Sequence, residues 1–369
     1  MCERLTALYH VACTAPAIAA RAQAIAVEQS VEMPLEGIED ADVRANIVGR
    51  VESIDDLGDG RFAVRIGLAA ATTGAEAGQL FNMLFGNISL QPDVELVDVD
   101  LPDALAAAFP GPNLGIAGLR ALAGVPARAL TAGALKPQGL PADGLAAIAG
   151  RLADGGIDLI KDDHGLADQA YSPFAARVAA VSRALHDSAA RTGRLTRYLP
   201  SLAGTLDDMR RQVELGRRHG LRAFLVAPMV AGIPTFAALV RDFPDTGFMT
   251  HPALSGIARI APPLFYGKLF RLLGADAVVY PNHGGRFGYT PATCADLAVA
   301  ARAPWHHLRP ALPVPAGGMT PERVGEMLDF YGPDTIVLIG GALLAARGRL
   351  TEAVAAFAAQ VAGHDYRRG

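Results

Sequence analysis

Residues 155–165 read Gly-Gly-Ile-Asp-Leu-Ile-Lys-Asp-Asp-His-Gly, and the organisation of the chain can be worked out from this stretch. A short apolar strand over residues 158–160 runs directly into a lysine, two aspartates and a histidine at residues 161–164. These four ionisable side chains cannot all be buried without partners, because desolvating each charge costs several kcal/mol. The stretch is therefore either a solvated loop or a site where a cation gathers the carboxylates, and we favour the cation site.

The composition is that of a large globular protein. With 369 residues, 51% hydrophobic and 19% charged, the chain has enough apolar material for two domains and is not expected to be disordered. A formal net charge of -4 without a basic block predicts no nucleic-acid partner. The three cysteines, Cys2, Cys13 and Cys294, match no metal or redox spacing, which favours a reducing compartment.

No membrane partner is expected either. No apolar run approaches the ~20 residues that a membrane-spanning helix needs. The N-terminus lacks the charged and then apolar layout of a signal peptide. We therefore expect a cytoplasmic protein.

The first 112 residues predict a small α+β domain of the ferredoxin-like kind. Strands are expected at residues 5–13, 61–68 and 94–100, and helices at 16–27 and 76–86. This order suits an antiparallel sheet backed by helices. Residues 104–118, which contain Pro-Gly-Pro-Asn, are expected to form a linker.

Residues 113–369 predict a (β/α)8 barrel. Eight strand-length apolar runs alternate with helical segments; they are residues 129–135, 158–163, 195–202, 223–228, 248–254, 277–281, 314–318 and 335–341. Eight such units over about 250 residues have the size of this fold, whose chemistry lies at the C-terminal ends of the strands.

Polar and glycine residues follow several of these strands. They are Lys136, residues 161–164, His251, His283, Arg286, Gly317, Gly318, Gly340 and Gly341. Each also has an ordinary structural explanation, such as a surface lysine, a solvated turn or a structural histidine. Together, glycines after strands seven and eight suit a phosphate, and carboxylates beside lysines suit a divalent cation. A phosphorylated sugar or sugar acid would fill such a site.

These motifs resemble those of the RuBisCO large-chain superfamily, and specifically its non-carboxylating RuBisCO-like proteins. The matching segments are Leu-Lys-Pro at residues 135–137, residues 155–163, His-Pro-Ala at 251–253, residues 316–318, residues 340–341 and Phe-Gly-Asn at 85–87. The resemblance runs in order over nearly the whole chain. It implies an antiparallel homodimer in which one barrel and the partner's N-terminal domain share each active site, and it is compatible with a larger oligomer.

The resemblance also implies roles for single residues. Lys161 matches the lysine that reacts with CO2 to form a carbamate, which with Asp163 holds Mg2+. Lys136 matches a lysine that moves protons at the enediolate, and His251 a histidine that contacts substrate oxygens. The glycine pairs at 317–318 and 340–341 match phosphate-binding segments. Asn87 matches an asparagine that the partner subunit contributes.

Three departures from the family pattern narrow the function. In the family the third metal ligand is a glutamate, and this chain has His164 at that position. Three roles are open for His164: metal ligand, acid or base in the pocket, or bystander. Residues 281–289 contain no lysine, so we expect no CO2 fixation. Asn87 stands where the methionine-salvage enolases carry a lysine base, which leaves Lys136, His164, His251 and His283 as candidate bases.

A site without the enolase base and without the carboxylase lysine suits decarboxylation of a β-keto sugar-acid phosphate of the 3-oxo-isoapionate 4-phosphate type. Lys136 or a histidine would then donate the proton, and Arg286 or His283 would hold the carboxylate. The alternative is an isomerase or enolase of a 5-methylthioribulose-1-phosphate or 2,3-diketo-5-methylthiopentyl-1-phosphate type substrate. A barrel that binds a sugar phosphate without catalysis is the non-enzymatic alternative.

Overall fold

The computed structural model describes residues 3–366, so Cys2 lies outside the described residues. The chain divides into two compact units. Unit 1 comprises Met1–Pro110 with Leu254–Phe265 and Trp305–His307, and unit 2 comprises the rest. The expected division at residue 112 assigned the two short later segments to the barrel domain, whereas here they belong to unit 1.

Unit 1 contains a four-stranded sheet in the order β2-β3-β1-β4, with antiparallel pairing throughout. The strands are β1 (Arg4–Ala12), β2 (Arg50–Gly58), β3 (Arg61–Ala69) and β4 (Val94–Asp100), and its longer helices are α1 (Ile18–Glu28) and α2 (Ala77–Phe85). In β1 every second side chain is buried, from Leu5 to Val11, so one face of the sheet packs on the core. The predicted α+β unit is confirmed.

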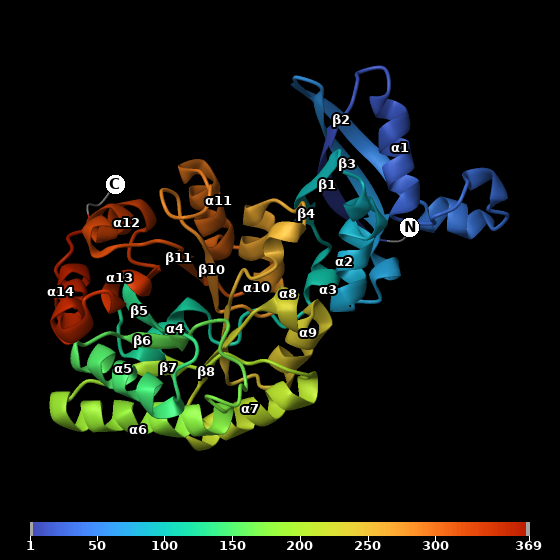
Figure 1. Cartoon of the computed structure of the whole chain (residues 1–369). Coiled ribbons are helices and arrows are strands. Elements are labelled where there is room, and N and C mark those ends of the chain that lie inside the picture. Colours follow the sequence, from blue (N-terminus) through green and yellow to red (C-terminus); the bar gives the residue numbers. More distant parts are fainter. Residues whose placement is uncertain (1–2, 367–369) are drawn as a thin grey trace. The chain divides into compact units, whose positions relative to one another are not determined.

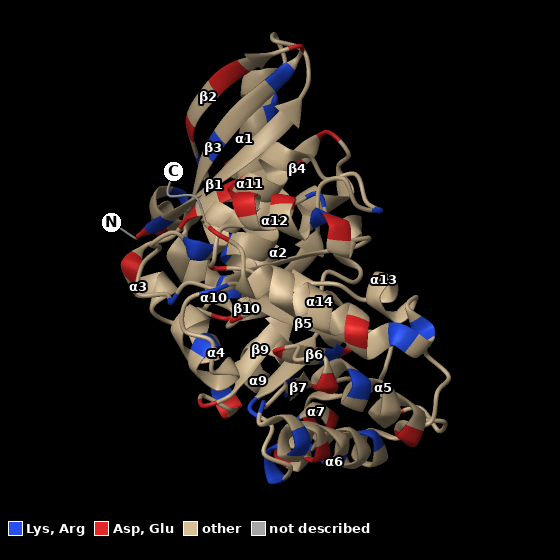
Figure 2. Cartoon of the chain, turned by 90° about the vertical axis from the view of Figure 1, so that its left-hand side faces the viewer, with Lys and Arg blue, Asp and Glu red and all other residues tan. Residues whose placement is uncertain are grey.

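The sequence patterns did not predict β2. Its side chains are mostly exposed, and charged residues lie along it (Figure 2). An edge strand without a clear apolar alternation gives no period-two signal, because only its backbone pairing with β3 places it in the sheet.

The division between the two units after Pro110 lies within residues 104–118, the predicted linker, but parts of this segment are helical. Helix α3 (Asp103–Ala106) begins within unit 1, and α4 (Gly115–Ala123) begins within unit 2. Leu105 and Phe109 are buried in unit 1, and burial of these apolar side chains folds the segment.

Unit 2 is the predicted barrel, and all eight predicted strands occur. They are β5 (Leu130–Leu135), β6 (Leu159–Asp162), β7 (Arg197–Leu199), β8 (Ala223–Val226), β9 (Gly247–Thr250), β10 (Ala277–Pro281), β11 (Leu312–Ala316) and β12 (Ile336–Leu338). They pair in parallel as β12-β5-β6-β7 and β8-β9-β10-β11. A bridge between Ser201 and Leu225 joins the two groups beyond the end of β7.

Helices surround these strands (Figure 1). They include α5 (Ala142–Asp154), α6 (Phe174–Thr192), α7 (Leu206–Arg218), α9 (Ile233–Asp242), α11 (Pro291–Arg302), α12 (Val324–Tyr331) and α14 (Leu350–Ala362). Inside, aliphatic side chains from every strand form one buried cluster, with Leu130, Leu159 and Leu225 among its members. The barrel interior is therefore a packed apolar core, and ionisable groups gather at the ends of the strands.

Within residues 155–165, the part that precedes β6 has a structural role. Asp158 lies before β6, where its carboxylate accepts hydrogen bonds from Arg128 at 2.7 and 2.8 Å and from the Thr131 backbone and hydroxyl at 2.8 Å. Gly155 ends α5 against α14, where a Cβ would lie 2.6 Å from Val354 Cβ.

Within residues 3–366, no helix is long and apolar enough to cross a membrane.

Candidate active site

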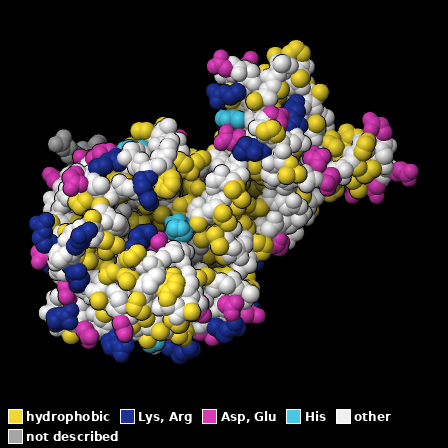
Figure 3. Space-filling view, in the orientation of Figure 1, with side chains coloured by type: hydrophobic (Ala, Val, Ile, Leu, Met, Phe, Trp, Pro, Cys, Tyr) yellow, Lys and Arg dark blue, Asp and Glu magenta, His cyan; other side chains and the backbone are white. Residues whose placement is uncertain are grey.

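Five of the predicted site residues form one polar cluster at the C-terminal ends of the barrel strands. Lys136 follows β5, and His251 follows β9. Lys161 lies within β6, and Asp163 and His164 follow that strand. In Figure 3 the middle of unit 2 is hollowed, and histidine, basic and acidic side chains gather there. We refer to these five residues as the mouth cluster.

Asp163 is the centre of the mouth cluster. Its Oδ2 lies 2.8 Å from Lys136 Nζ, and its Oδ1 lies 3.1 Å from His164 Nδ1. Burial opposes ionisation of this carboxyl, but the hydrogen bonds from His164 and Lys136 and the charges of Lys136 and Lys161 outweigh it. The pKa of Asp163 is therefore lower than usual, and the group is a carboxylate at neutral pH.

Lys161 is almost fully buried, with 4% of its surface exposed, and its Nζ donates to the backbone carbonyl of Asp162 at 2.9 Å. Burial is the main cause that lowers the pKa of Lys161 to about 8. The charge of Lys136 adds to this, and Asp163 opposes it. A much larger fraction of Lys161 is thus a neutral, nucleophilic amine near neutral pH than for an exposed lysine.

Asp162 points away from the mouth cluster, as expected from the alternation of side chains along a strand. Its carboxylate accepts from Arg177 Nε at 3.0 Å, the Tyr198 hydroxyl at 2.7 Å and the Ser201 backbone at 3.0 Å. Arg177 and Asp162 are both fully buried. Neither Arg177 nor Tyr198 carried a sequence signal, because only packing of α6 and β7 brings them to β6.

The His164 and His251 rings stack, with centroids 4.1 Å apart and planes inclined by 10°. His251 Nδ1 accepts the Ala253 backbone N–H at 3.2 Å, so the neutral ring carries its proton on Nε2. Burial, followed by the positive charges of Lys161 and His164, lowers the pKa of His251 to about 2. The ring is therefore a neutral hydrogen-bond donor.

The side chains alone do not form a ready metal site. Among the described residues, no group of three His, Cys, Asp or Glu side chains is placed to hold a metal. With both lysines protonated, two ammonium groups face one carboxylate, and a divalent cation would be repelled. A carbamate on Lys161 would change that charge from +1 to -1 and add oxygen ligands, and the donor set with Asp163 and His164 would then suit a divalent cation.

Four predicted phosphate-binding residues lie on loops after other strands. The Arg286 backbone N–H donates to Gly317 carbonyl at 2.7 Å, and Gly317 and Gly318 have φ of 89° and 102°, where a side chain would be strained. A Cβ on Gly340 would lie 3.8 Å from Lys136 Cε, so its backbone borders the mouth cluster. Gly341 begins α13 (Gly341–Leu344).

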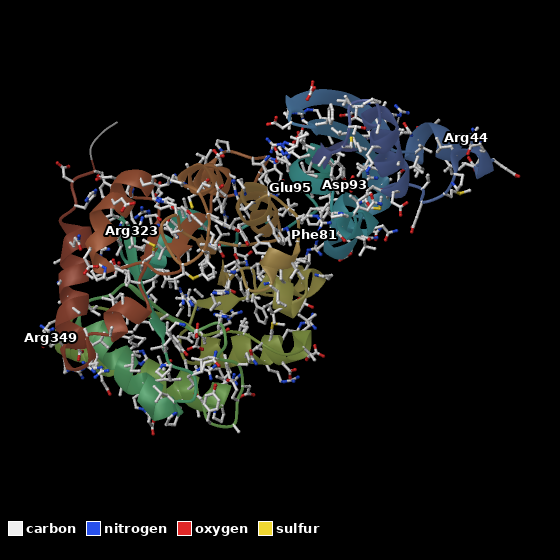
Figure 4. The ribbon with its side chains drawn as sticks, turned by 45° about the horizontal axis from the view of Figure 1, so that its top comes forward. Arg44, Phe81, Asp93, Glu95, Arg323 and Arg349 are labelled. Carbon is white, nitrogen blue, oxygen red and sulfur yellow. The ribbon has the colours of Figure 1, made fainter. Side chains whose placement is uncertain are left out.

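His283 lies on the loop after β10 and packs against α12. Its ring packs on Phe330 with centroids 4.7 Å apart, its Nδ1 lies 4.0 Å from Glu326, and its carbonyl accepts from Arg323, which Figure 4 labels. These contacts hold the His283 ring against α12, and its role in holding substrate or transferring protons stays a prediction.

Asn87 lies in unit 1. Its amide donates to Glu28 at 2.9 Å and to Glu32 at 2.5 Å. Both partners belong to the same unit, so the amide is held in place before any partner subunit is considered.

Comparison with known proteins adds the following. Residues 115–366 match the family model described as ribulose bisphosphate carboxylase large chain, catalytic domain. The chain is 61% identical over 364 residues to 5-methylthioribulose-1-phosphate isomerase of Rhodospirillum rubrum, covering 98% of this chain and 97% of that protein. It is 31% identical over 317 residues to 2,3-diketo-5-methylthiopentyl-1-phosphate enolase of Geobacillus kaustophilus, covering 80% and 76%.

Among solved structures, the Rubisco-like protein from Rhodopseudomonas palustris superposes with a TM-score of 0.93 at 54% identity, covering 99% of each chain. The similarity therefore extends over both units.

Proposed function

Because this chain belongs to the RuBisCO large-chain family and is a RuBisCO-like protein, we propose that it is an isomerase acting on a sugar phosphate of the 5-methylthioribulose-1-phosphate type. The observation that carries the proposal is the 61% identity to an isomerase of that substrate over almost the full length of both chains. The enolase is half as similar, and Asn87 cannot supply a base.

The decarboxylase hypothesis gains no support from these comparisons. It also needs a group that holds a substrate carboxylate, and His283 packs on Phe330 instead. Arg286, the other candidate, is exposed, and its guanidinium carbon lies 5.5 Å from the centre of the Phe287 ring. The methylthioribulose alternative therefore replaces decarboxylation as our main proposal.

Isomerisation of a ketose phosphate requires removal of a proton beside the ketone and its return at another carbon. In our proposal the neutral amine of Lys136 takes the proton from one carbon, and the resulting ammonium, which pairs with Asp163 at 2.8 Å, returns it to the other carbon. The neutral His251 would donate from Nε2 to an enediol oxygen, where a neutral imidazole is an effective donor. Backbones of the glycines at 317–318 and 340–341, with Arg286, would bind the phosphate.

We further propose that Lys161 is carbamylated in the active protein and that Lys161, Asp163 and His164 hold Mg2+. The buried amine with its lowered pKa supports this, because carbamate formation needs the neutral amine. The cation would supply Lewis-acid polarisation of the substrate's carbonyl group. We also propose a homodimer in which Asn87 reaches the partner's barrel.

The test is a proton NMR assay of 5-methylthioribulose-1-phosphate in D2O, with Mg2+ and bicarbonate present or absent. We expect conversion to an isomeric ketose phosphate with deuterium incorporation at the reacting carbon. Lys161→Ala should abolish turnover with the circular dichroism spectrum unchanged. Turnover by Lys161→Ala would remove the carbamate from the mechanism.

The same assay distinguishes the other functions. Release of CO2 from a β-keto sugar-acid phosphate, without conversion of the methylthio substrate, would restore the decarboxylase. Turnover of 2,3-diketo-5-methylthiopentyl-1-phosphate alone would identify an enolase. Binding that needs no metal and gives no turnover of any of the three would identify a non-catalytic binder.

A further inference from the structure

A cavity of about 80 Å³ lies at the end of the barrel opposite the mouth cluster. Its walls come from α6, from the start of β7 and from the turn that leads out of α7 into β8. The mouth cluster follows the C-terminal ends of the strands, whereas these residues precede or begin them. The two sites are therefore separated by the packed core of the barrel.

The polar side chains that line this cavity are hydrogen-bond donors. They are Ser182, His186, Thr196, Arg197, Tyr198, His219 and Arg222, and no Asp or Glu is among the lining residues. The hydroxyls of Thr196 and Tyr198 already donate to the Ile157 carbonyl and to Asp162, so they are not free for a ligand. Leucines form the remaining wall. A cavity lined by donors and apolar groups, without a carboxylate, favours an anion over a cation.

Arg197 has no anionic partner within the described part of the chain. Its Nε donates to the Leu122 carbonyl at 2.6 Å, and no carboxylate pairs with its guanidinium. Burial without a compensating charge lowers the pKa of Arg197. Arg222 differs, because it already pairs with Asp245 at 2.8 Å. Half-burial of an unpaired guanidinium is unfavourable unless an anion joins it.

Ser182 provides a second, independent observation. It lies on α6 with 5% of its surface exposed, and its hydroxyl has no hydrogen-bond partner among the described residues. An unpaired buried hydroxyl is uncommon, because the lost hydrogen bond is not replaced. A water could satisfy Ser182, and the cavity is several times larger than one water needs, but a water would leave the charge of Arg197 unpaired.

We propose that this cavity binds a small phosphate-class oxyanion, either inorganic phosphate or the phosphate group of a small monoester. Arg197 and Ser182 are its principal donors, and His186 and His219 complete the ring. Donors from three different chain segments suit the tetrahedral oxygens of phosphate better than the two coplanar oxygens of a carboxylate.

Isothermal titration of the full-length protein with inorganic phosphate tests the proposal. Wild type should show a saturable phase that Arg197→Gln weakens by roughly tenfold or more, the loss expected when a charge-assisted hydrogen bond is removed. Arg194→Gln is the matched control, because Arg194 is exposed and does not line the cavity; its titration should match that of wild type.

Ser182→Ala provides a second test in case the Arg197→Gln variant does not fold. It removes only one hydroxyl oxygen, so the apolar contacts of α6 are kept. It should weaken the same phase while the melting temperature is unchanged. Phosphate monoesters and acetate are titrated in parallel. If wild type, Ser182→Ala and Arg197→Gln give superimposable phosphate titrations, or if acetate binds in preference to phosphate, the cavity is not a phosphate site.

Discussion

His251 is a histidine whose ring stays neutral because burial and neighbouring cations disfavour its protonation. Its backbone-bonded Nδ1 and its stacking on His164 fix one tautomer and one orientation. No sequence pattern indicated the stack, since His164 and His251 are separated by 87 positions and meet only when β6 and β9 enclose the same barrel.

His251 should also make the protein sensitive to acid. Its pKa is about 2 when folded and near 6.5 when unfolded, so between these values the unfolded chain binds the extra proton. Stability is therefore fully present above pH 6.5 and is lost as pH falls, by up to about 1.4 kcal/mol per pH unit. His251→Gln should flatten this dependence in urea unfolding at pH 7.5 and 5.0.

The matched control for that experiment is the exposed His307, whose substitution by Gln should leave the pH dependence as in wild type. If the free energy of unfolding falls equally with pH in wild type and in His251→Gln, burial of this imidazole does not cause the loss of stability in acid.

Lys136 is the residue whose loss should affect turnover most specifically. Lys136→Met keeps the apolar stem and removes the ammonium, so we expect kcat to fall by about 10²–10⁴ with the fold intact. Lys136→Arg preserves the ion pair with Asp163 but cannot transfer the proton, so it should not restore kcat. Lys268→Met, in a lysine outside the mouth cluster, is the control; a restored kcat in Lys136→Arg would limit Lys136 to a structural role.

At the scale of elements, successive side chains of β6 point to opposite sides of the strand, and the two sides have different roles. Lys161 and Asp163 face the mouth, while Asp162 on the opposite side bonds Arg177 of α6 and Tyr198 of β7. The buried Arg177–Asp162 pair fixes the strand, because breaking a pair with no exposed surface leaves an uncompensated charge.

The join of α5 to β6 depends on Gly155. In Gly155→Ala the new Cβ would lie 2.6 Å from Val354 Cβ and 2.9 Å from the Thr351 carbonyl, so α14 would have to shift. We expect a loss of about 1–3 kcal/mol in the free energy of unfolding. The control is Gly150→Ala within α5, where the new Cβ would lie 3.9 Å from Ala184 Cβ, an ordinary van der Waals contact.

Because alanine favours a helix, Gly150→Ala should be neutral or stabilise by up to about 1 kcal/mol. Chemical denaturation of both variants measures the difference. Equal stability of Gly155→Ala and wild type would show that α14 accommodates the methyl group without cost.

At the scale of the whole molecule, the proposed sharing of active sites between subunits predicts complementation. Lys161→Ala and Asn87→Ala, each inactive alone, should regain about a quarter of wild-type activity after mixing and reassembly, because half of the random dimers carry one intact site of two. Lys161→Ala mixed with Lys136→Met should regain none, since both residues belong to one barrel. Recovery in both mixtures, or in neither, would contradict a site shared through Asn87.

Much of the fold could be predicted because its signals are local. The eight apolar runs of the barrel, the alternation of β1 and β3 and the polar residues after β6 are each visible within a few positions. The exposed β2 and the short helix α3 were missed, because their places depend on pairing with β3 and on burial of Phe109.

The sequence by itself determined the barrel, its order of strands and the gathering of Lys136, Lys161, Asp163, His164 and His251 at one end, because parallel strands carry their C-terminal residues to the same edge. Only the tertiary structure decided which of those groups are charged and where His283 packs. Burial sets the pKa of Lys161 near 8 and keeps His251 neutral, and packing holds the His283 ring against Phe330. Desolvation and packing depend on neighbours that are distant in sequence, so no local pattern records them.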